Sequence, residues 1–188
     1  MDVHIDSKPN ESLVTEQLLE FGNAFPMTIV QIKEWIDYFT SIGVAALQNA
    51  LRDENPLVRE YAAQAVGILN HAAIEAIPAL IVAVRDPLCS VREKSIAALG
   101  RMGPGAASAT RVLAKALLDK EPSVRRYAAA ALGEIGPAAI AAVSALIIAM
   151  SDPDDYVREF AIQALNDIMR IGKRSHLKIV SSDKTIKD

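Results

Sequence analysis

The stretch Pro122–Gly136, PSVRRYAAAALGEIG, recurs along the chain and decides its fold. Related stretches begin at Pro56 (PLVREYAAQAVGILN), Cys89 (CSVREKSIAALGRMG) and Asp155 (DYVREFAIQALNDIM). The valine in third position recurs at an interval of 33 residues, at Val58, Val91, Val124 and Val157. Self-similarity at a fixed period of this length is typical of solenoids, in which each repeat packs on its neighbours.

Each recurring stretch is expected to form an α-helix, here called helix B. Its apolar and small residues follow the spacing i, i+4, i+7, i+8 and i+11, which marks one face of a helix. In the first copy these residues are Val58, Ala62, Ala65, Val66 and Leu69. A shorter apolar stretch, helix A, precedes each copy and begins at Val44, Ile77, Thr110 or Val143. Each unit is therefore predicted to be helix A, a tight turn, helix B and another tight turn.

The register predicts an all-α fold, a right-handed α-solenoid of four helix pairs at residues 41–73, 74–106, 107–139 and 140–170. Residues 11–40 depart from the repeat, with Pro26 in the place of its arginine, and are expected to form a helical cap. Trp35 and Tyr38 belong to this segment, and the alternative is that they form a docking patch. We expect residues 1–10 to be disordered and residues 171–188 to be a polar, flexible tail.

The pattern D-x-x-P-x-V-R-x-x-A-A-x-A-L-G-x-I-G, matched at Asp119–Gly136, resembles the HEAT repeat. More narrowly, it is similar to the short, alanine-rich HEAT subtype named after phycobilisome lyases, and the resemblance covers residues 42–169. It implies that two charged ladders tie neighbouring turns together. The ladders are Asp53, Asp86, Asp119 and Asp152, and Arg59, Arg92, Arg125 and Arg158. Because a catalytic pair is needed only once, their repetition favours a structural role.

In HEAT-like solenoids the B helices line the concave face, so the resemblance implies a groove on the side of helix B opposite its core positions. In the first copy that side carries positions 60, 64 and 68, with position 61 beside them. The candidate binding residues at matching positions are Tyr61, Gln64, Lys94, Arg126, Tyr127, Phe160 and Gln163. Their aromatic rings suit the role of anchors, because tyrosine is enriched at binding hot spots. The alternative is that the rings fill space between B helices.

Helix A of the last copy, IAAVSALIIAM from Ile140, is apolar around its whole circumference. Such a helix should be buried, yet only helix B and a polar tail follow it. The sequence therefore predicts an end-on interface through Ile147 and Ile148, with a second subunit or a second copy of the chain. The alternative is that the tail folds back over these residues.

The composition disfavours several classes of protein. The formal net charge is −3 and no basic stripe is present, so nucleic acid is not an expected partner. The longest apolar run, residues 138–150, is too short to span a bilayer, which needs about 20 residues. The polar N-terminus does not resemble a secretory signal, and the single cysteine, Cys89, fits a reducing compartment. A cytoplasmic protein without a membrane span is expected.

No catalytic constellation or metal site is expected from the sequence. His4, His71 and His176 are far apart and lack the spacing of metal ligands. The chain also lacks the His-Glu pair with which the HEAT-like deoxyhypusine hydroxylases bind iron. Cys89 is interpreted as a turn residue, because proline holds the matching place in two other copies.

Two functions remain open at this point. The subtype resemblance implies a phycobilin lyase subunit or chaperone that assists covalent attachment of a linear tetrapyrrole to cysteines of phycobiliproteins. Such a protein would have no intrinsic cofactor. Phycobilin would be its bound substrate, and an apo-phycobiliprotein and a second lyase subunit would be its partners. The alternative is a non-catalytic scaffold or regulatory adaptor unrelated to bilins, so the sequence leaves open whether the protein is an enzyme.

Overall fold

The computed structural model describes residues 11–24 and 28–181, with only the backbone of Ile29 and of residues 170–181. Every regular element among the described residues is helical, so the predicted all-α class is confirmed. The chain forms two compact units, Met1–Ala98 and Leu99–Asp188, and the boundary falls inside helix α6 (Cys89–Arg101). Residues 1–10, predicted to be disordered, and residues 182–188 of the predicted tail lie outside the described residues.

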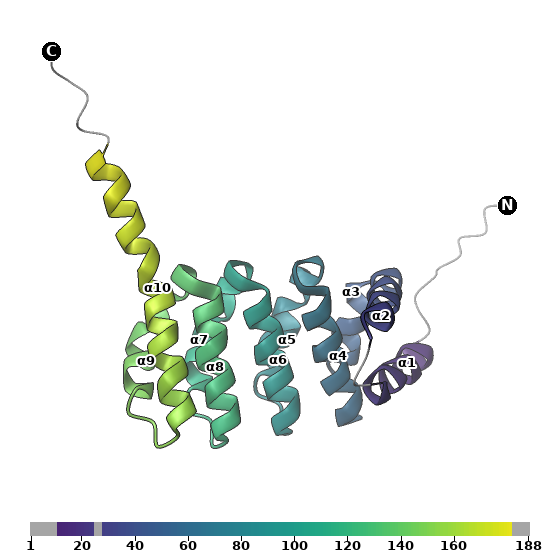
Figure 1. The fold of residues 1–188 in the computed structure, drawn as a ribbon. Coiled ribbons are helices and arrows are strands. Elements are labelled where there is room, and N and C mark those ends of the chain that lie inside the picture. Colours follow the sequence, from purple (N-terminus) through teal and green to yellow (C-terminus); the bar gives the residue numbers. More distant parts are fainter. Residues whose placement is uncertain (1–10, 25–27, 182–188) are drawn as a thin grey trace, which may run out of the picture. The chain divides into compact units, whose positions relative to one another are not determined.

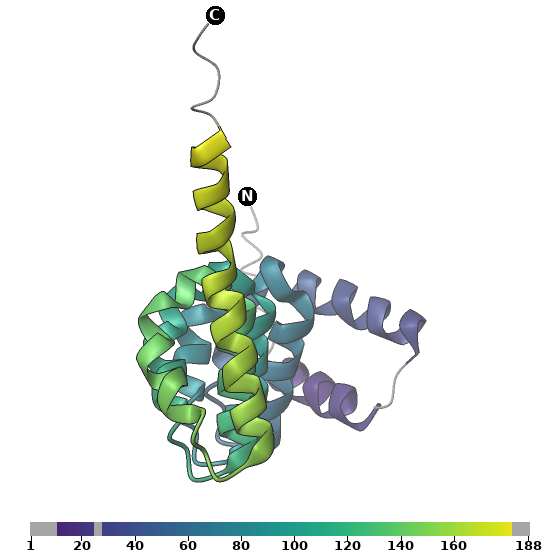
Figure 2. The same ribbon diagram turned by 60° about the vertical axis from the view of Figure 1, so that its left-hand side comes forward.

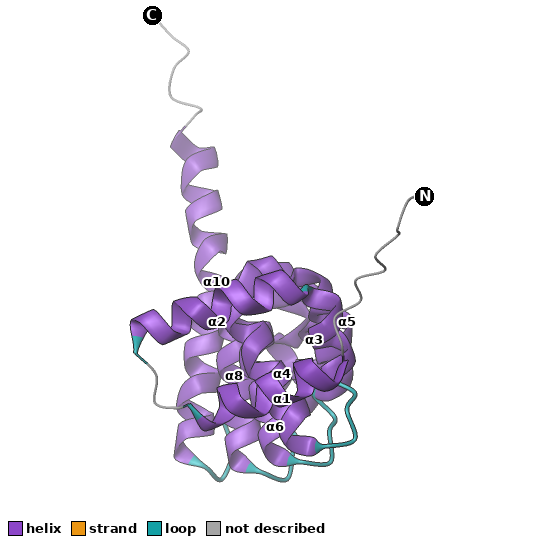
Figure 3. Ribbon diagram, turned by 90° about the vertical axis from the view of Figure 1, so that its right-hand side faces the viewer, coloured by secondary structure: helices purple, strands orange, loops and turns teal. Residues whose placement is uncertain are grey.

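The first unit opens with two helices that precede the repeats, α1 (Glu11–Asn23) and α2 (Ile29–Ile42). The repeat elements that follow are α3 (Val44–Ala50), α4 (Pro56–Leu69), the 3-10 helix η1 (Asn70–Ala76), α5 (Ile77–Ala83) and most of α6. Both α1 and α2 pack against α3 and α4 (Figure 3). The first two helices therefore cover the first repeat of this unit.

An aromatic cluster joins α1 to α2. Phe21 and Phe39 are fully buried, with their ring centroids 5.1 Å apart. Trp35 lies edge-on to Phe21 at 5.3 Å and stacks on Phe39 at 5.5 Å. Tyr38 lies edge-on to Trp35 at 5.8 Å, and burial raises the pKa of its hydroxyl. Trp35 and Tyr38 are half-buried and thus pack within the helix pair.

The second unit continues with η2 (Gly103–Ala109), α7 (Thr110–Ala116), α8 (Pro122–Ile135), η3 (Gly136–Ala142), α9 (Val143–Ala149) and α10 (Asp155–Ser181). Its two complete B helices, α8 and α10, lie side by side (Figure 1). The expected core positions of α8 are all buried, at Val124, Ala128, Ala131, Leu132 and Ile135. The stacked helix pairs within each unit are those of the predicted solenoid.

Glycine allows neighbouring B helices of the second unit to approach closely. A Cβ on Gly133 would lie 3.1 Å from the Cα of Ala164, and a Cβ on Gly100 would lie 3.0 Å from the Cα of Ala131. These distances are tighter than ordinary van der Waals contact. The same position of the last copy holds Asn166, which has no following repeat in the chain.

The connection from helix B to the next helix A is longer than the tight turn that the sequence predicts. It is a 3-10 helix of seven residues, and each begins with a residue at positive φ. These residues are Asn70 (51°), Gly103 (56°) and Gly136 (67°). Glycine adopts such angles without a steric penalty, so two of the three repeats carry it there.

Helix α10 lacks this stop signal. Met169 holds the position that corresponds to Gly136, and no proline follows Pro153 in the sequence. The helix therefore continues to Ser181 and extends past α8 (Figure 2). Residues 171–181, which we expected to belong to a flexible tail, are helical because no residue in this segment ends the helix.

The charged ladders link successive repeats within each unit. In the first unit, Arg59 donates to both carboxylate oxygens of Asp86, from Nε at 2.7 Å and from Nη2 at 3.0 Å. In the second, Arg125 binds Asp152 in the same way, at 2.7 and 2.8 Å. Each arginine also donates from Nη1 to the backbone oxygen of its own repeat's ladder aspartate, at 2.9 Å. This geometry supports the structural role that the ladders were expected to have.

Two stretches, residues 56–83 and 122–149, are apolar and long enough to cross a membrane by length and composition alone. Each is bent where positive φ occurs, at Asn70 and Gly136, and comprises a helix B, a 3-10 helix and a helix A. Within each stretch, helix B packs against the 3-10 helix that follows it. Their apolar residues therefore contribute to packing between helices.

Candidate protein-binding face

The B-helix face of the second unit is the surface of α8 and α10 that helix packing leaves exposed or half-buried. It carries Arg126, Tyr127, Ala130, Glu134, Tyr156, Phe160, Gln163 and Asp167. Helical periodicity places these residues there, since Val124, Ala128 and Leu132 occupy the buried side of α8. Three large aromatic side chains on this face are at least about a third exposed, Tyr127 at 37%, Tyr156 at 60% and Phe160 at 36%.

A pocket of about 220 Å³ lies between α8 and α10 on this face. Small residues make room for it, with Ala130 and Gly133 on α8 and Ala164 on α10. Phe160 and Gln163, both candidates from the sequence, line the same pocket. The structure thus brings two predicted binding residues together around a concave feature.

Two acidic residues that were not among the predicted candidates also line this pocket. Asp167 accepts hydrogen bonds from Nε2 of Gln163, at 3.1 and 3.0 Å. Glu134 is partly exposed, but partial burial of its carboxylate raises its pKa, an effect that the positive charge of Arg101 reduces. Both acids match position 68 of the first copy, one of the positions predicted to face the groove. The repeat alignment could therefore have identified them.

A cationic and aromatic cluster occupies the start of the same face. The guanidinium of Arg126 lies over the ring of Tyr127 at 5.7 Å and over the ring of Tyr156 at 5.8 Å. Tyr156 is 60% exposed and was not predicted, because leucine or serine holds its place in the other copies. A guanidinium on aromatic faces is held in place while its N–H donors stay accessible.

The other three candidates lie in the first unit. Tyr61 packs against α1, since a Cβ on Gly22 would lie 2.0 Å from Cζ of its ring. The ring thus has a packing role, but against α1 and not between two B helices as the alternative had it. Gln64 and Lys94 are half-buried. The structure therefore groups Arg126, Tyr127, Phe160 and Gln163 on one surface and gives Tyr61 a packing role.

The end of the last repeat exposes apolar side chains. Ile147 is 55% exposed and Met150 is 41% exposed, whereas Leu117, which matches Met150 in the preceding repeat, is buried. Ile162 on α10 is 46% exposed, although its counterpart Ala129 is fully buried. Ile148 is exposed as well, but so is Lys115, its counterpart in the preceding repeat. The exposure of Ile148 is therefore not particular to the last repeat. The end surface thus includes Ile147, Met150 and Ile162.

The described residues contain no group of three or more His, Cys, Asp or Glu side chains that could hold a metal ion. Cys89 is half-buried, and its thiol donates to the Glu93 carboxylate at 3.3 Å. The arrangement on the B-helix face can bind a partner through aromatic, cationic and acidic groups.

Comparison with known families identifies the repeats. A family model described as HEAT repeats matches residues 44–131 and 110–184, which together span most of the chain. No curated protein matches the sequence. The match covers both compact units and includes every residue of the B-helix face.

Solved structures share this architecture at low sequence identity. An engineered protein is 22% identical with a TM-score of 0.63, covering 99% of this chain and 87% of the other. The complex of CpcE and CpcF of phycocyanin lyase from Nostoc sp. PCC7120 is 19% identical with a TM-score of 0.65, covering 82% and 99%. A designed armadillo repeat protein in complex with the peptide (KR)4 is 18% identical with a TM-score of 0.67, covering 95% and 90%. These likenesses show a shared solenoid fold.

Proposed function

Because this chain belongs to the HEAT-repeat family, we propose that it binds a segment of a partner protein on the B-helix face of its second unit. The observation that carries this proposal is the pocket between α8 and α10, with Phe160 on its wall and Tyr127 exposed nearby on α8. Exposed aromatic side chains next to a concave feature are typical of binding hot spots. The pocket accepts one side chain, and the two rings provide apolar contact area around it.

The more specific proposal is that this protein is a phycobilin lyase subunit or chaperone. Two findings support it: the alanine-rich repeat pattern at Asp119–Gly136, and the similarity in fold to the complex of phycocyanin lyase from Nostoc. A linear tetrapyrrole has an extended conjugated π system and carboxylate side chains. Tyr127, Tyr156 and Phe160 would contact its rings, and Arg126 would pair with a carboxylate.

In this proposal the reacting thiol belongs to the acceptor phycobiliprotein. The chain has a single cysteine, Cys89, whose thiol lies against a carboxylate. The protein would hold bilin and acceptor in the orientation needed for attachment, and positioning of this kind accelerates a reaction without a nucleophile of its own. The proposed setting is the cytoplasm, with phycobilin as a bound substrate.

A second lyase subunit is proposed to cover the end surface of Ile147, Met150 and Ile162. Leu117 and Ala129, the counterparts of Met150 and Ile162 in the preceding repeat, are buried, and exposed apolar patches of this kind mark interfaces. Analytical ultracentrifugation of an equimolar mixture with a second lyase subunit tests this contact. Ile147→Glu should abolish the complex, whereas Lys115→Glu on the outer side of α7 should leave it intact.

The competing function is a scaffold or adaptor that binds a peptide without bilin. The acidic pair Glu134 and Asp167 favours it, since these residues would attract a basic side chain into the pocket. The designed armadillo protein with a comparable fold holds a peptide of alternating lysine and arginine. This reading requires the same face but no tetrapyrrole.

One experiment separates the two functions. The purified protein is mixed with phycocyanobilin and an apo-phycobiliprotein, with and without a second lyase subunit, and covalent product is followed by absorbance and fluorescence. Product that forms only with this protein, and falls with Tyr127→Ala but not with Lys115→Ala, supports the lyase function. An unchanged yield in every mixture contradicts it and leaves the scaffold.

A further inference from the structure

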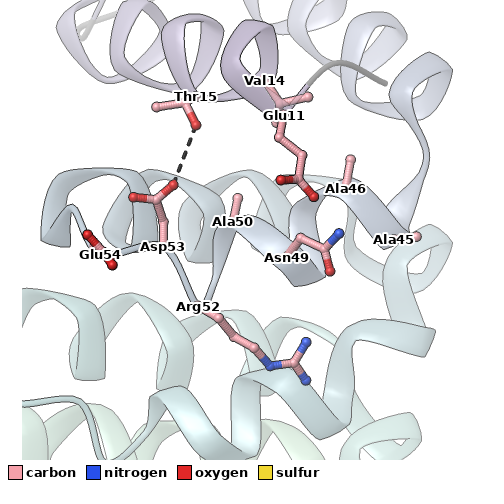
Figure 4. A pocket seen from close by; sticks show the side chains of 10 residues that line it. All are labelled: Glu11, Val14, Thr15, Ala45, Ala46, Asn49, Ala50, Arg52, Asp53 and Glu54. Atoms are coloured by element: carbon pink, nitrogen blue, oxygen red, sulfur yellow. Dashed lines mark hydrogen bonds between the residues drawn. The ribbon is translucent and has the colours of Figure 1, made fainter. Parts of the chain in front are cut away.

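The first unit contains a cavity of about 620 Å³ at some distance along the chain from the B-helix face (Figure 4). It lies between α1 and α3 and is closed at one side by the turn that follows α3. Val14 and Thr15 line it from α1, Ala46 and Ala50 from α3, and Asp53 and Glu54 from the turn. The lining is therefore mixed: alanines and Val14 form its apolar part, Asp53 and Glu54 stand at the turn, and Glu11 and Arg52 add one charge of each sign.

Asp53 is the first residue of the aspartate ladder, and its carboxylate is held as in the later repeats. Its Oδ1 accepts a hydrogen bond from the backbone N–H of Asn55 at 2.8 Å. In the same way, Oδ1 of Asp86 accepts a hydrogen bond from the backbone N–H of Leu88, and Oδ1 of Asp152 accepts one from the backbone N–H of Asp154, both at 2.9 Å. Oδ1 of Asp119 accepts the matching bond from Glu121 at 3.0 Å, so the turn presents this carboxylate in the same orientation in all four repeats.

The later repeats show what this orientation binds. Asp86 and Asp152 each receive the forked guanidinium of an arginine from the preceding repeat, through Nε and Nη2, at distances of 2.7 to 3.0 Å. The aspartate position of this repeat is therefore built for a guanidinium. Such a bidentate pair is stronger and more specific in geometry than a contact with a single point charge.

Asp53 has no such partner among the described residues. The residue 33 positions before Arg59 is Pro26, which carries no charge. The polar side chain that approaches the carboxylate instead is Thr15, whose Oγ1 lies 3.5 Å from Oδ2 (Figure 4). The cavity lies beside this carboxylate, and the residue at the ladder spacing of 27 positions before Asp53 is not an arginine.

We propose that this cavity binds an arginine side chain of a partner protein. The guanidinium would pair with the Asp53 carboxylate, and its aliphatic stem would lie along Val14, Ala46 and Ala50. Glu11 and Glu54 also line the cavity, and with Asp53 they outnumber its one basic lining residue, Arg52, so the net charge of the lining favours a cation. This site belongs to the first unit, so it does not depend on the function proposed for the B-helix face.

A second copy of this chain does not supply the arginine by extending the solenoid. Arg158, the last arginine of the ladder, pairs with Asp155 of its own helix and donates to the backbone oxygens of Asp152 and Pro153, at 2.7 and 3.1 Å. Helix α1 also stands where a preceding repeat would have to pack against α3. The arginine must therefore come from a side chain that enters from outside the repeat stack.

Titration of the full-length protein with two short peptides tests the proposal. The probes are acetyl-Gly-Arg-Gly-amide and its lysine counterpart, followed by calorimetry and by backbone amide shifts of Ala46 and Ala50. The arginine peptide should bind about tenfold more tightly than the lysine peptide, because only the guanidinium forms the fork. Asp53→Asn should lower the affinity for the arginine peptide by about tenfold or more.

Asp53→Asn keeps the oxygen that accepts the Asn55 N–H, and circular dichroism verifies that the variant is folded. Asp167→Asn in the second unit is the matched control and should leave binding unchanged. Equal affinity for the two peptides, shifts confined to residues outside the cavity, or full binding by Asp53→Asn would each overturn the proposal. Absence of binding to the wild-type chain would overturn it too.

Discussion

The guanidinium of Arg125 holds the carboxylate of Asp152, 27 residues further along the chain, through two hydrogen bonds of 2.7 and 2.8 Å. The two side chains are only 11% and 9% exposed. Arg125 also donates to the backbone oxygen of Asp119, so one side chain connects the turn before α8 to the turn before α10. Arg59 and Asp86 repeat this arrangement in the first unit.

Replacing Arg125 by alanine should destabilise the protein by about 3 kcal/mol, because it leaves the Asp152 carboxylate buried without its counter-ion. Urea unfolding followed by circular dichroism measures the change. Arg111→Ala is the matched control, since Arg111 is exposed on α7, and its effect should stay below about 0.5 kcal/mol. Equal effects of the two substitutions would show that the ladder does not stabilise the fold.

The same pair makes stability depend on pH. Hydrogen bonds from Arg125 lower the pKa of Asp152 in the folded protein, and burial of the carboxylate opposes this only in part. The unfolded chain therefore binds the proton more readily, so the stabilising contribution is complete above the ordinary aspartate pKa of about 4. It is lost as the pH falls through the lower pKa of the folded state. Urea unfolding at several pH values should show a shallower acid-side decline for Asp152→Asn than for the wild type.

Asn70→Gly should stabilise the first unit. Asn70 has φ 51° and ψ −124°, and its side-chain oxygen is buried without a hydrogen bond from any described residue. Glycine occupies the same position as Gly103 and Gly136 in the next repeats. Relief of backbone strain outweighs the added freedom of the unfolded chain, for a net gain of about 1 kcal/mol.

Thermal unfolding measures this gain, and the reverse substitution provides its control. Gly103→Asn places a side chain at φ 56° and should lower the melting temperature. A lower melting temperature for Asn70→Gly would mean that the asparagine stabilises the fold by more than its backbone strain costs.

Gly22→Ala should loosen the contact between α1 and α4. The added methyl group would lie 2.0 Å from the ring of Tyr61, so the ring must move, at a cost of about 1 to 3 kcal/mol. In a Tyr61→Ala background the same change should become neutral or stabilising, since alanine favours a helix by up to about 1 kcal/mol over glycine. A double-mutant cycle in urea measures the coupling. Additive effects would show that Tyr61 does not pack against Gly22.

The repeat register made most of the architecture predictable. Val58, Val124 and Val157 are all fully buried because each occupies the same position of a helix that packs on the next pair in the same way. The paired charges Arg59–Asp86 and Arg125–Asp152 follow the same register. Position 68 of that register also pointed to Glu134 and Asp167, although the candidate list did not include them.

Residues that break the register could not be placed from the sequence. Tyr61 matches Tyr127 in the repeat, yet one packs on Gly22 of α1 and the other is exposed on α8. Met169 matches Gly136, yet it continues a helix that the glycine ends. In both cases the outcome depends on an element that the repeat does not contain, the preceding helix pair or the following segment.

The sequence by itself determined the helix pairs, their period and their buried faces, because a contact that recurs every 33 residues leaves the same pattern each time. Only the tertiary structure decided which members of each ladder have a partner. Asp53, Asp86 and Asp152 are the same residue in the same turn, but α1 packs where a preceding repeat would supply the arginine for Asp53. The cavity beside Asp53 and the pocket beside Phe160 arise from packing between helices, which local sequence does not specify.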